Sequence, residues 1–93
     1  MDLQIKDKKV LLTGATRGIG YGAARRFAEA GAKIWIHGSR KDSCEIAQQR
    51  LLEEFPKSSI AISPCDFDDS KAVIDWIAHL PAMDILVNNL GVY

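Results

Sequence analysis

A short glycine-rich segment, Thr13–Gly20, limits the folds open to this chain more than any other feature of its sequence. It contains three glycines and lies between a compact apolar run, Lys9–Thr13, and a segment in which apolar residues recur at helical spacing, Ile19–Ala30. The first pattern predicts a buried strand and the second an amphipathic helix. The sequence therefore predicts a strand that turns sharply into a helix.

Each of these three glycines has its own physical purpose in such a turn. Gly14 supplies backbone angles that side chains disfavour, Gly18 lets the main chain approach a ligand closely, and Gly20 allows the first helical turn to pack tightly. The unpaired N–H groups at the start of the helix carry partial positive charge, so a pyrophosphate is a natural ligand for them. A tight turn without a ligand is the alternative interpretation.

Strand and helix patterns alternate along the rest of the chain. Further strands are predicted at Lys33–His37, Ile60–Ser63 and Asp84–Asn88, with helical patterns between them. The order β-α-β-α-β-α-β is typical of parallel strands joined by right-handed crossovers. The residues therefore predict one α/β domain built on a parallel sheet.

Polar residues and glycine mark the expected ends of the helices. Asp42 and Glu45 resemble a capping box at the start of the second helix. Either Asp69 or Ser70 is expected to cap the third helix. Gly31 is placed to end the first helix with a positive φ.

Charge and composition exclude several classes of partner. The 93 residues carry 12 basic and 12 acidic side chains, and this balance indicates neither a nucleic-acid nor a membrane partner. The cysteines and histidines lack metal-ligand spacing, so no metal site is expected. His37 is expected to be a strand residue at the end of the sheet, with no function assigned. Without a signal peptide or membrane-spanning run, we expect a cytoplasmic protein with reduced thiols.

Three motifs follow predicted strands. The first is the Gly14-x-x-x-Gly18-x-Gly20 spacing, the second is Asn88–Gly91, and the third is Asp66. Together they resemble the motifs of the short-chain dehydrogenase/reductase family. The segments Ile36–Asp42 and Asp84–Gly91 are also similar to those of ketoacyl carrier-protein reductases and unassigned bacterial relatives. The resemblance implies a Rossmann-type, doubly wound parallel sheet of strand order 3-2-1-4. It also implies that the whole chain, 1–93, is the N-terminal part of a single NAD(P)-binding domain.

The resemblance further implies roles for residues that follow the strands. An aspartate at position 66 usually contacts the adenine amino group in the family, with the next residue, here Phe67, beside the ring. Thr13 is expected to satisfy backbone groups near the Asn88 turn. Leu90 stands where the family usually has alanine, which puts a larger side chain beside the expected cofactor channel.

The end of the second strand bears on the choice between NAD and NADP. An acidic residue there would bind the ribose 2′-hydroxyl and repel a 2′-phosphate, and none occurs between Ile34 and Lys41. Ser39 can donate a hydrogen bond, and Arg40 offers a planar fork suited to phosphate oxygens. Arg17 could approach the same phosphate from the glycine turn. The sequence therefore predicts NADP rather than NAD, with solvated surface positions for both arginines as the alternative.

Family members transfer a hydride between nicotinamide and a carbonyl or alcohol, using a Tyr-x-x-x-Lys pair and an upstream serine. This chain has no such pair, because Tyr21 is followed four residues on by Arg25 and Tyr93 is the last residue. No catalytic residue is therefore assigned, and the resemblance implies the cofactor-binding half of a longer enzyme. The predicted cofactor-binding set is Gly14, Thr16, Arg17, Gly18, Ile19, Gly20, Ser39, Arg40, Asp66, Phe67, Asn89, Leu90 and Gly91.

A sheet of this order would leave the outer edge of its fourth strand bare, around Ile85–Val87. Exposed apolar edges favour pairing with another chain, so a homo-oligomer is expected. Two alternatives to the enzyme remain: a non-enzymatic NADP-binding sensor or scaffold, and an interaction fragment without a ligand. Titration with NADPH distinguishes the interaction fragment, which would not bind the nucleotide, from the enzyme and the sensor, which would.

Overall fold

The computed structural model describes residues 4–90 of the chain and contains one parallel sheet of four strands. The strand order is β3-β2-β1-β4, which confirms the predicted order and the Rossmann-type topology. Because each crossover returns the chain to the same end of the sheet, the carboxyl ends of all four strands lie at one edge. The strands are β1 (Lys9–Thr13), β2 (Lys33–Ile36), β3 (Ile60–Ile62) and β4 (Ile85–Asn88).

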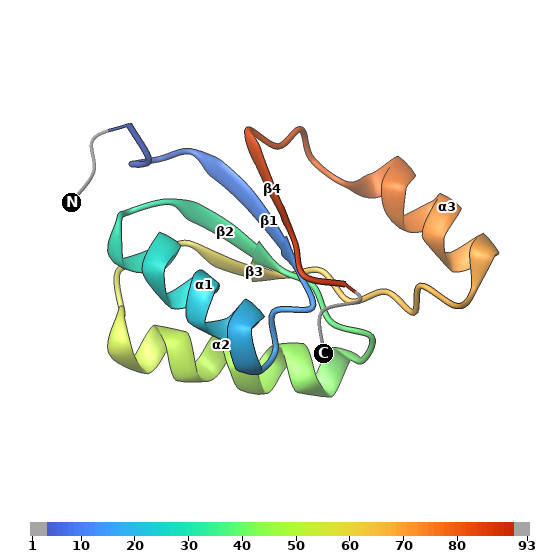
Figure 1. The fold of residues 1–93 in the computed structure, drawn as a ribbon, viewed down its shortest axis with the longest axis horizontal. Coiled ribbons are helices and arrows are strands. Elements are labelled where there is room, and N and C mark those ends of the chain that lie inside the picture. Colours follow the sequence, from blue (N-terminus) through green and yellow to red (C-terminus); the bar gives the residue numbers. More distant parts are fainter. Residues whose placement is uncertain (1–3, 91–93) are drawn as a thin grey trace.

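Three helices connect the strands. Figure 1 shows α1 and α2 packed side by side on one face of the sheet, with α3 on the opposite side of β4. An exposed ion pair between Arg25 and Glu54 joins α1 to α2, and the Arg25 guanidinium lowers the pKa of the Glu54 carboxyl. The helices are α1 (Gly18–Glu29), α2 (Lys41–Glu54) and α3 (Ser70–His79).

The hydrophobic core lies between the sheet and the first two helices. Val10 and Leu12 on β1, together with Ile34 and Ile36 on β2, are fully buried on the face that α1 and α2 cover. Each such side chain contributes roughly 1.5–3 kcal/mol by leaving water. Small residues on the helix face, such as Ala24, let α1 approach the sheet closely. The core therefore fixes the end of β1 and the start of α1, where the glycine turn lies.

The helix boundaries follow the predicted ones with small shifts, but one capping prediction is wrong. The second helix begins at Lys41, so Asp42 lies inside its first turn rather than at the N-cap. The N-cap is Arg40, which makes no side-chain capping bond. Asp69 does cap α3, because its carboxylate accepts a hydrogen bond from the Ala72 N–H at 3.1 Å. Gly31 has φ +87°, which confirms the predicted end of α1.

The second face of the sheet is only partly covered by the described residues. Ile74 and Ile77 on α3 are 70% and 59% exposed, although their spacing suggested a packed helix face. In the described part of the chain β4 pairs only with β1, and Leu86 on β4 is 62% exposed. Within the described residues, 4–90, the outer edge of β4 is therefore unpaired, as the sequence predicts. None of the helices in this region is long and apolar enough to cross a lipid bilayer.

Candidate functional site

The glycine turn has the backbone geometry that its sequence predicts. Gly14 and Gly18 have φ values of +59° and +60°, a region in which side chains are strained. A Cβ added to Gly20 would lie 2.1 Å from the carbonyl oxygen of Gly14, so the first helical turn packs directly on the turn before it. A Cβ at Gly18 would meet no atom within 4 Å, which leaves open space beside the backbone there.

The N-terminus of α1 offers free hydrogen-bond donors to that space. Its first intrahelical bond runs from the Tyr21 N–H to the Arg17 carbonyl at 3.2 Å. The amides of Gly18–Gly20 therefore precede the hydrogen-bonded ladder, and no side chain from the described residues caps them. The first turn carries no acidic residue, so its partial positive charge is not neutralised locally. An anion is the ligand that this arrangement favours.

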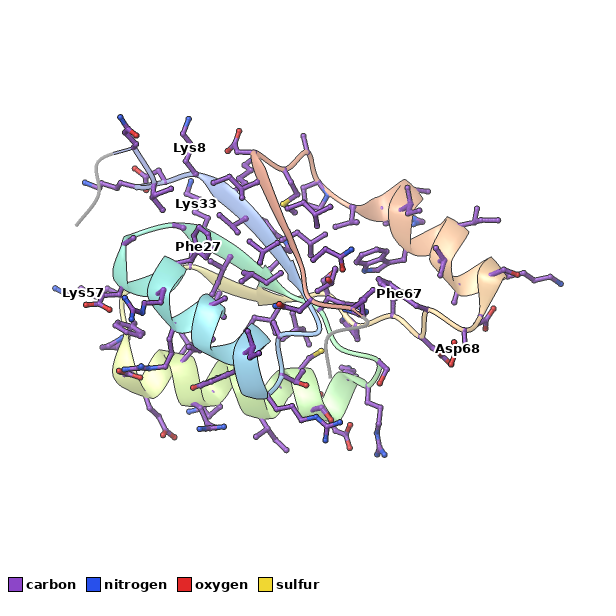
Figure 2. All side chains as sticks on the ribbon, in the orientation of Figure 1. Lys8, Phe27, Lys33, Lys57, Phe67 and Asp68 are labelled. Atoms are coloured by element: carbon purple, nitrogen blue, oxygen red, sulfur yellow. The ribbon has the colours of Figure 1, made fainter. Side chains whose placement is uncertain are left out.

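A pocket of about 520 Å³ lies at the carboxyl ends of the strands, in front of these amides. Its walls come from the segments that follow all four strands, including Phe67 in the loop between β3 and α3 (Figure 2). Most of the predicted set lines it: Gly14, Thr16, Arg17, Gly18, Ile19, Gly20, Ser39, Asp66, Phe67, Asn89 and Leu90. The pocket also includes His37, Gly38, Cys65 and Asp68, which were not predicted.

Two residues of the predicted set are not among the lining residues. Gly91 lies outside the described part of the chain. The Arg40 guanidinium binds the carboxylate of Asp42, with its Nε and Nη2 atoms 3.1 and 2.8 Å from the two oxygens. This pairing lowers the pKa of the Asp42 carboxyl. The Arg40 side chain is 73% exposed, so its place next to Ser39 does not bring it into the pocket wall.

A hydrogen-bond network joins the carboxyl ends of β1 and β4. The Thr13 hydroxyl donates to Oδ1 of Asn88 at 2.8 Å and accepts from the Asn89 N–H at 3.1 Å. The Leu90 N–H also donates to Asn88 Oδ1, at 3.0 Å. This confirms that Thr13 satisfies backbone near the Asn88 turn. The side-chain nitrogen of Asn89 is buried without a hydrogen-bond partner among residues 4–90, and such a donor is costly unless a ligand or water binds it.

Of the four pocket residues that sequence reasoning missed, His37 makes the most contacts that the structure records with the glycine turn. It lies directly after β2 and is only 2% exposed. Its Nδ1 atom accepts a hydrogen bond from the Gly14 N–H at 3.1 Å, and Nε2 is 2.9 Å from the Cys65 carbonyl. Its ring stacks on Phe67 at 4.1 Å and lies 5.5 Å from Trp76. The signal that could have found it is position: a histidine directly follows β2, at the same sheet edge as the glycine turn.

Burial sets the ionisation of the site's weaker acids and bases. It lowers the pKa of His37, and the hydrogen bond to the Cys65 carbonyl only partly opposes this effect. Burial also raises the pKa of the Cys65 and Cys44 thiols, so both stay protonated near neutral pH. Among residues 4–90, no cluster of three or more His, Cys, Asp or Glu side chains could hold a metal ion.

A parallel sheet with a glycine turn and a free helix N-terminus at its carboxyl edge defines a nucleotide-binding α/β protein of the Rossmann class. The family model for short chain dehydrogenases matches residues 8–93, which is most of the chain. The protein belongs to the short-chain dehydrogenase family, whose members are oxidoreductases that bind nicotinamide cofactors.

Individual relatives agree with this assignment. The chain is 36% identical to an uncharacterized oxidoreductase, YvrD, of Bacillus subtilis, over 100% of this chain and 35% of that protein. It is 34% identical to a 3alpha-hydroxysteroid dehydrogenase of Mediterraneibacter gnavus, over 99% of this chain and 38% of the relative. It also resembles the crystal structure of L-sorbose reductase from Gluconobacter frateurii complexed with NADPH and L-sorbose. That similarity has a TM-score of 0.82 and 30% identity, covering 98% of this chain and 36% of the reductase. The chain thus spans little more than a third of the length of these relatives.

Proposed function

We propose that this chain supplies the cofactor-binding part of an NADP(H)-dependent oxidoreductase acting on a carbonyl or alcohol substrate. The observation that carries the proposal is the row of free amides at Gly18–Gly20, which opens on a pocket of about 520 Å³. When bound, the nicotinamide cofactor would supply or accept the hydride. The chain's own residues bind and orient that cofactor.

The chemistry of the pocket fits a dinucleotide at several points. The free amides at the start of α1 suit the diphosphate, and the absence of a Cβ at Gly18 leaves room for it beside the backbone. The unpartnered nitrogen of Asn89 offers a further donor. Asp66 and Phe67, which line the same pocket, are proposed to bind the adenine amino group and ring. Leu90 and Gly91 are proposed to contact the cofactor mainly through their backbone.

The end of β2 supports NADP over NAD. No acidic residue lies between Ile34 and Lys41. Gly38 is also closely packed, because a Cβ there would lie 2.5 Å from the Thr16 methyl group and 3.1 Å from the Cys44 sulfur. Ser39 and Arg17 line the pocket and can bind a 2′-phosphate. Arg40 could join them only by releasing Asp42, which costs little because both side chains are exposed.

Substitution of the arginines tests the choice of nucleotide. A charge-assisted hydrogen bond contributes about 1.5–3 kcal/mol, so R17A should weaken NADP binding roughly tenfold or more while changing NAD binding little. R40A should have a smaller effect, and the double variant the largest. Equal losses for the two nucleotides would contradict the assignment of a 2′-phosphate site to these residues.

Binding itself is tested by fluorescence titration with NADPH. G18A should weaken binding, because the added methyl group occupies the space beside the amides and strains a residue with φ +60°. G22A is the matched control: it lies in the same helix, and its Cβ would also meet no atom within 4 Å. The proposal fails if the wild type does not bind NADPH, or if G18A binds it as tightly as G22A does.

The wider setting of the chain is part of the same proposal. We place residues 1–93 in the N-terminal part of a single NAD(P)-binding domain, as the alignment with about a third of each relative supports. The proton donor and the substrate-binding residues then lie elsewhere in the parent enzyme. For the 93 residues taken alone, the unpaired edge of β4 supports assembly as a homo-oligomer, and reduced thiols at Cys44 and Cys65 are consistent with the cytoplasm.

A further inference from the structure

The side chain of His37 bridges two loops that form the dinucleotide pocket. On one side its Nδ1 atom lies 3.1 Å from the amide nitrogen of Gly14, in the glycine turn. On the other side its Nε2 atom lies 2.9 Å from the Cys65 carbonyl, in the loop between β3 and α3. Its backbone carbonyl accepts from the Ala15 N–H at 2.9 Å as well. His37 therefore contacts the turn through both its side chain and its main chain.

These partners allow only one protonation state of the ring. A backbone N–H can only donate, so Nδ1 must carry a lone pair toward Gly14. A carbonyl can only accept, so Nε2 must carry the proton toward Cys65. Protonation of Nδ1 would set two N–H groups against each other at 3.1 Å, on a residue that is only 2% exposed. The native turn is thus compatible with the neutral Nε2–H tautomer and incompatible with the imidazolium.

We propose that neutral His37 is a positioning residue for the cofactor site, and that its protonation releases the glycine turn and weakens dinucleotide binding. The link to the site is direct, since the Gly14 carbonyl lies against Gly20, the third residue of α1. A shift at Gly14 moves the first helical turn and the amides that face the pocket. This inference rests on the proposed function of the pocket in cofactor binding.

The surroundings of the ring indicate that the pH response of the turn comes from protonation of His37 and not from a neighbouring charge. Phe67 and Trp76, which pack against the ring, carry no charge. The ionisable groups nearby are Asp66 and Asp68 on the pocket wall, Arg17 in the turn, the Cys65 thiol, and Asp75 and His79 in the groove beside Trp76. None of their charges is among the causes that shift the pKa of His37, which burial lowers.

Two substitutions separate the hydrogen bonds from the bulk of the ring. H37N can accept from the Gly14 N–H through its amide oxygen, which takes the place of Nδ1, and it stays neutral at every pH. H37L fills a similar volume but makes neither bond. At pH 8, H37N should bind NADP⁺ within about threefold of the wild type, while H37L should bind at least tenfold more weakly, about 1.4 kcal/mol. Far-UV circular dichroism shows whether H37L folds. If it does not, the pH profiles of H37N and the wild type test the inference.

The pH profile distinguishes positioning from simple packing. The 2′-phosphate of the ligand also titrates near pH 6, so both proteins lose affinity on acidification. Between pH 8 and 5.5 the wild type should lose at least threefold more affinity than H37N, because only the wild type also protonates His37. Parallel profiles for the two proteins would overturn the inference and leave the cofactor proposal intact.

Nitrogen NMR of the ligand-free protein gives an independent readout. We expect a protonated Nε2 and a bare Nδ1 at pH 8, and a Gly14 amide resonance that shifts as His37 titrates. A protonated Nδ1 at pH 8, or a Gly14 resonance that does not respond, would overturn the inference. If the wild type bound no dinucleotide at pH 8, the proposed function would fall, and these spectra would still decide whether His37 holds the turn.

Discussion

Gly20 lies where the glycine turn and α1 touch, and the substitution G20A tests that contact. The added Cβ would lie 2.1 Å from the Gly14 carbonyl oxygen and 2.9 Å from its carbonyl carbon. Real Cβ contacts essentially never fall below 3.0 Å, so the first distance is short by 0.9 Å. Because both contacting atoms belong to the backbone, no side-chain rotation can relieve the clash. The turn itself has to move.

The expected cost follows from two opposing effects. Forcing an extra methyl group into a packed site costs roughly 1–3 kcal/mol, and the rigid backbone contact puts Gly20 in the upper part of that range. Alanine gains up to about 1 kcal/mol over glycine in a helix interior. The steric effect is larger, so G20A should lower the free energy of unfolding by about 1–2 kcal/mol.

The same helix provides a matched control in Gly22. It is exposed, and a Cβ there would meet no atom within 4 Å. G22A should therefore show only the helix-propensity gain and raise the free energy of unfolding by up to about 1 kcal/mol. Identical substitutions two positions apart should thus have opposite signs.

Urea unfolding followed by circular dichroism at 222 nm measures both changes. The variants should differ by about 2–3 kcal/mol, and with a slope of roughly 2 kcal/mol/M their midpoints should be about 1 M apart or more. A G20A protein as stable as G22A, with an unchanged slope, would refute the reasoning. It would mean that the turn accommodates a side chain at position 20 and that the close packing of α1 is not essential.

Three further outcomes follow from the same structure. T13V should lose about 1–2 kcal/mol of stability, since it leaves the Asn89 N–H without its partner, whereas T13S should stay near wild type in the same urea assay. D69A should cost about 1 kcal/mol by removing the cap of α3, and D69N should restore most of it in thermal melts. Burial lowers the pKa of His37 in the folded state, so the unfolded chain binds more protons below pH 6.5. The stability that neutral His37 contributes should be complete above pH 6.5 and should fall as the pH drops below that value. The urea midpoint of H37N should lack this part of the pH dependence.

The sheet could be predicted from sequence because its signals are local and repeated. The strand at Lys9–Thr13 is apolar, short and followed by glycine, and the structure has it at the predicted bounds. Alternation of strands and helices fixes parallel pairing, and parallel pairing brings every strand's carboxyl end to one edge. Residues as far apart in the chain as Gly14 and Leu90 therefore line one pocket, as expected from topology alone.

The wrong or incomplete predictions concern side chains whose partners are set by small shifts along the chain. Asp42 was expected to cap α2, but the N-cap lies two residues earlier, at Arg40, and the Asp42 carboxylate binds the Arg40 guanidinium instead. The sequence gives no means of choosing between an N-cap at Asp42 and one at Arg40, because a capping hydrogen bond stabilises a helix by only about 1 kcal/mol. The same pairing occupies the exposed Arg40 guanidinium, so the assignment of Arg40 to phosphate binding stays a prediction.

The hydrogen-bond partners of His37 could not be predicted from sequence for a different reason. A lone histidine without metal spacing carries no pattern, and its partners, the Gly14 N–H and the Cys65 carbonyl, are backbone atoms that every sequence possesses. Only the three-dimensional arrangement shows that a single ring satisfies both. The turn proposed to bind a diphosphate is rich in glycine, and glycines leave the turn few side chains of its own to fix it. His37, the residue that follows β2, holds the turn from outside by accepting hydrogen bonds from the Gly14 and Ala15 N–H groups.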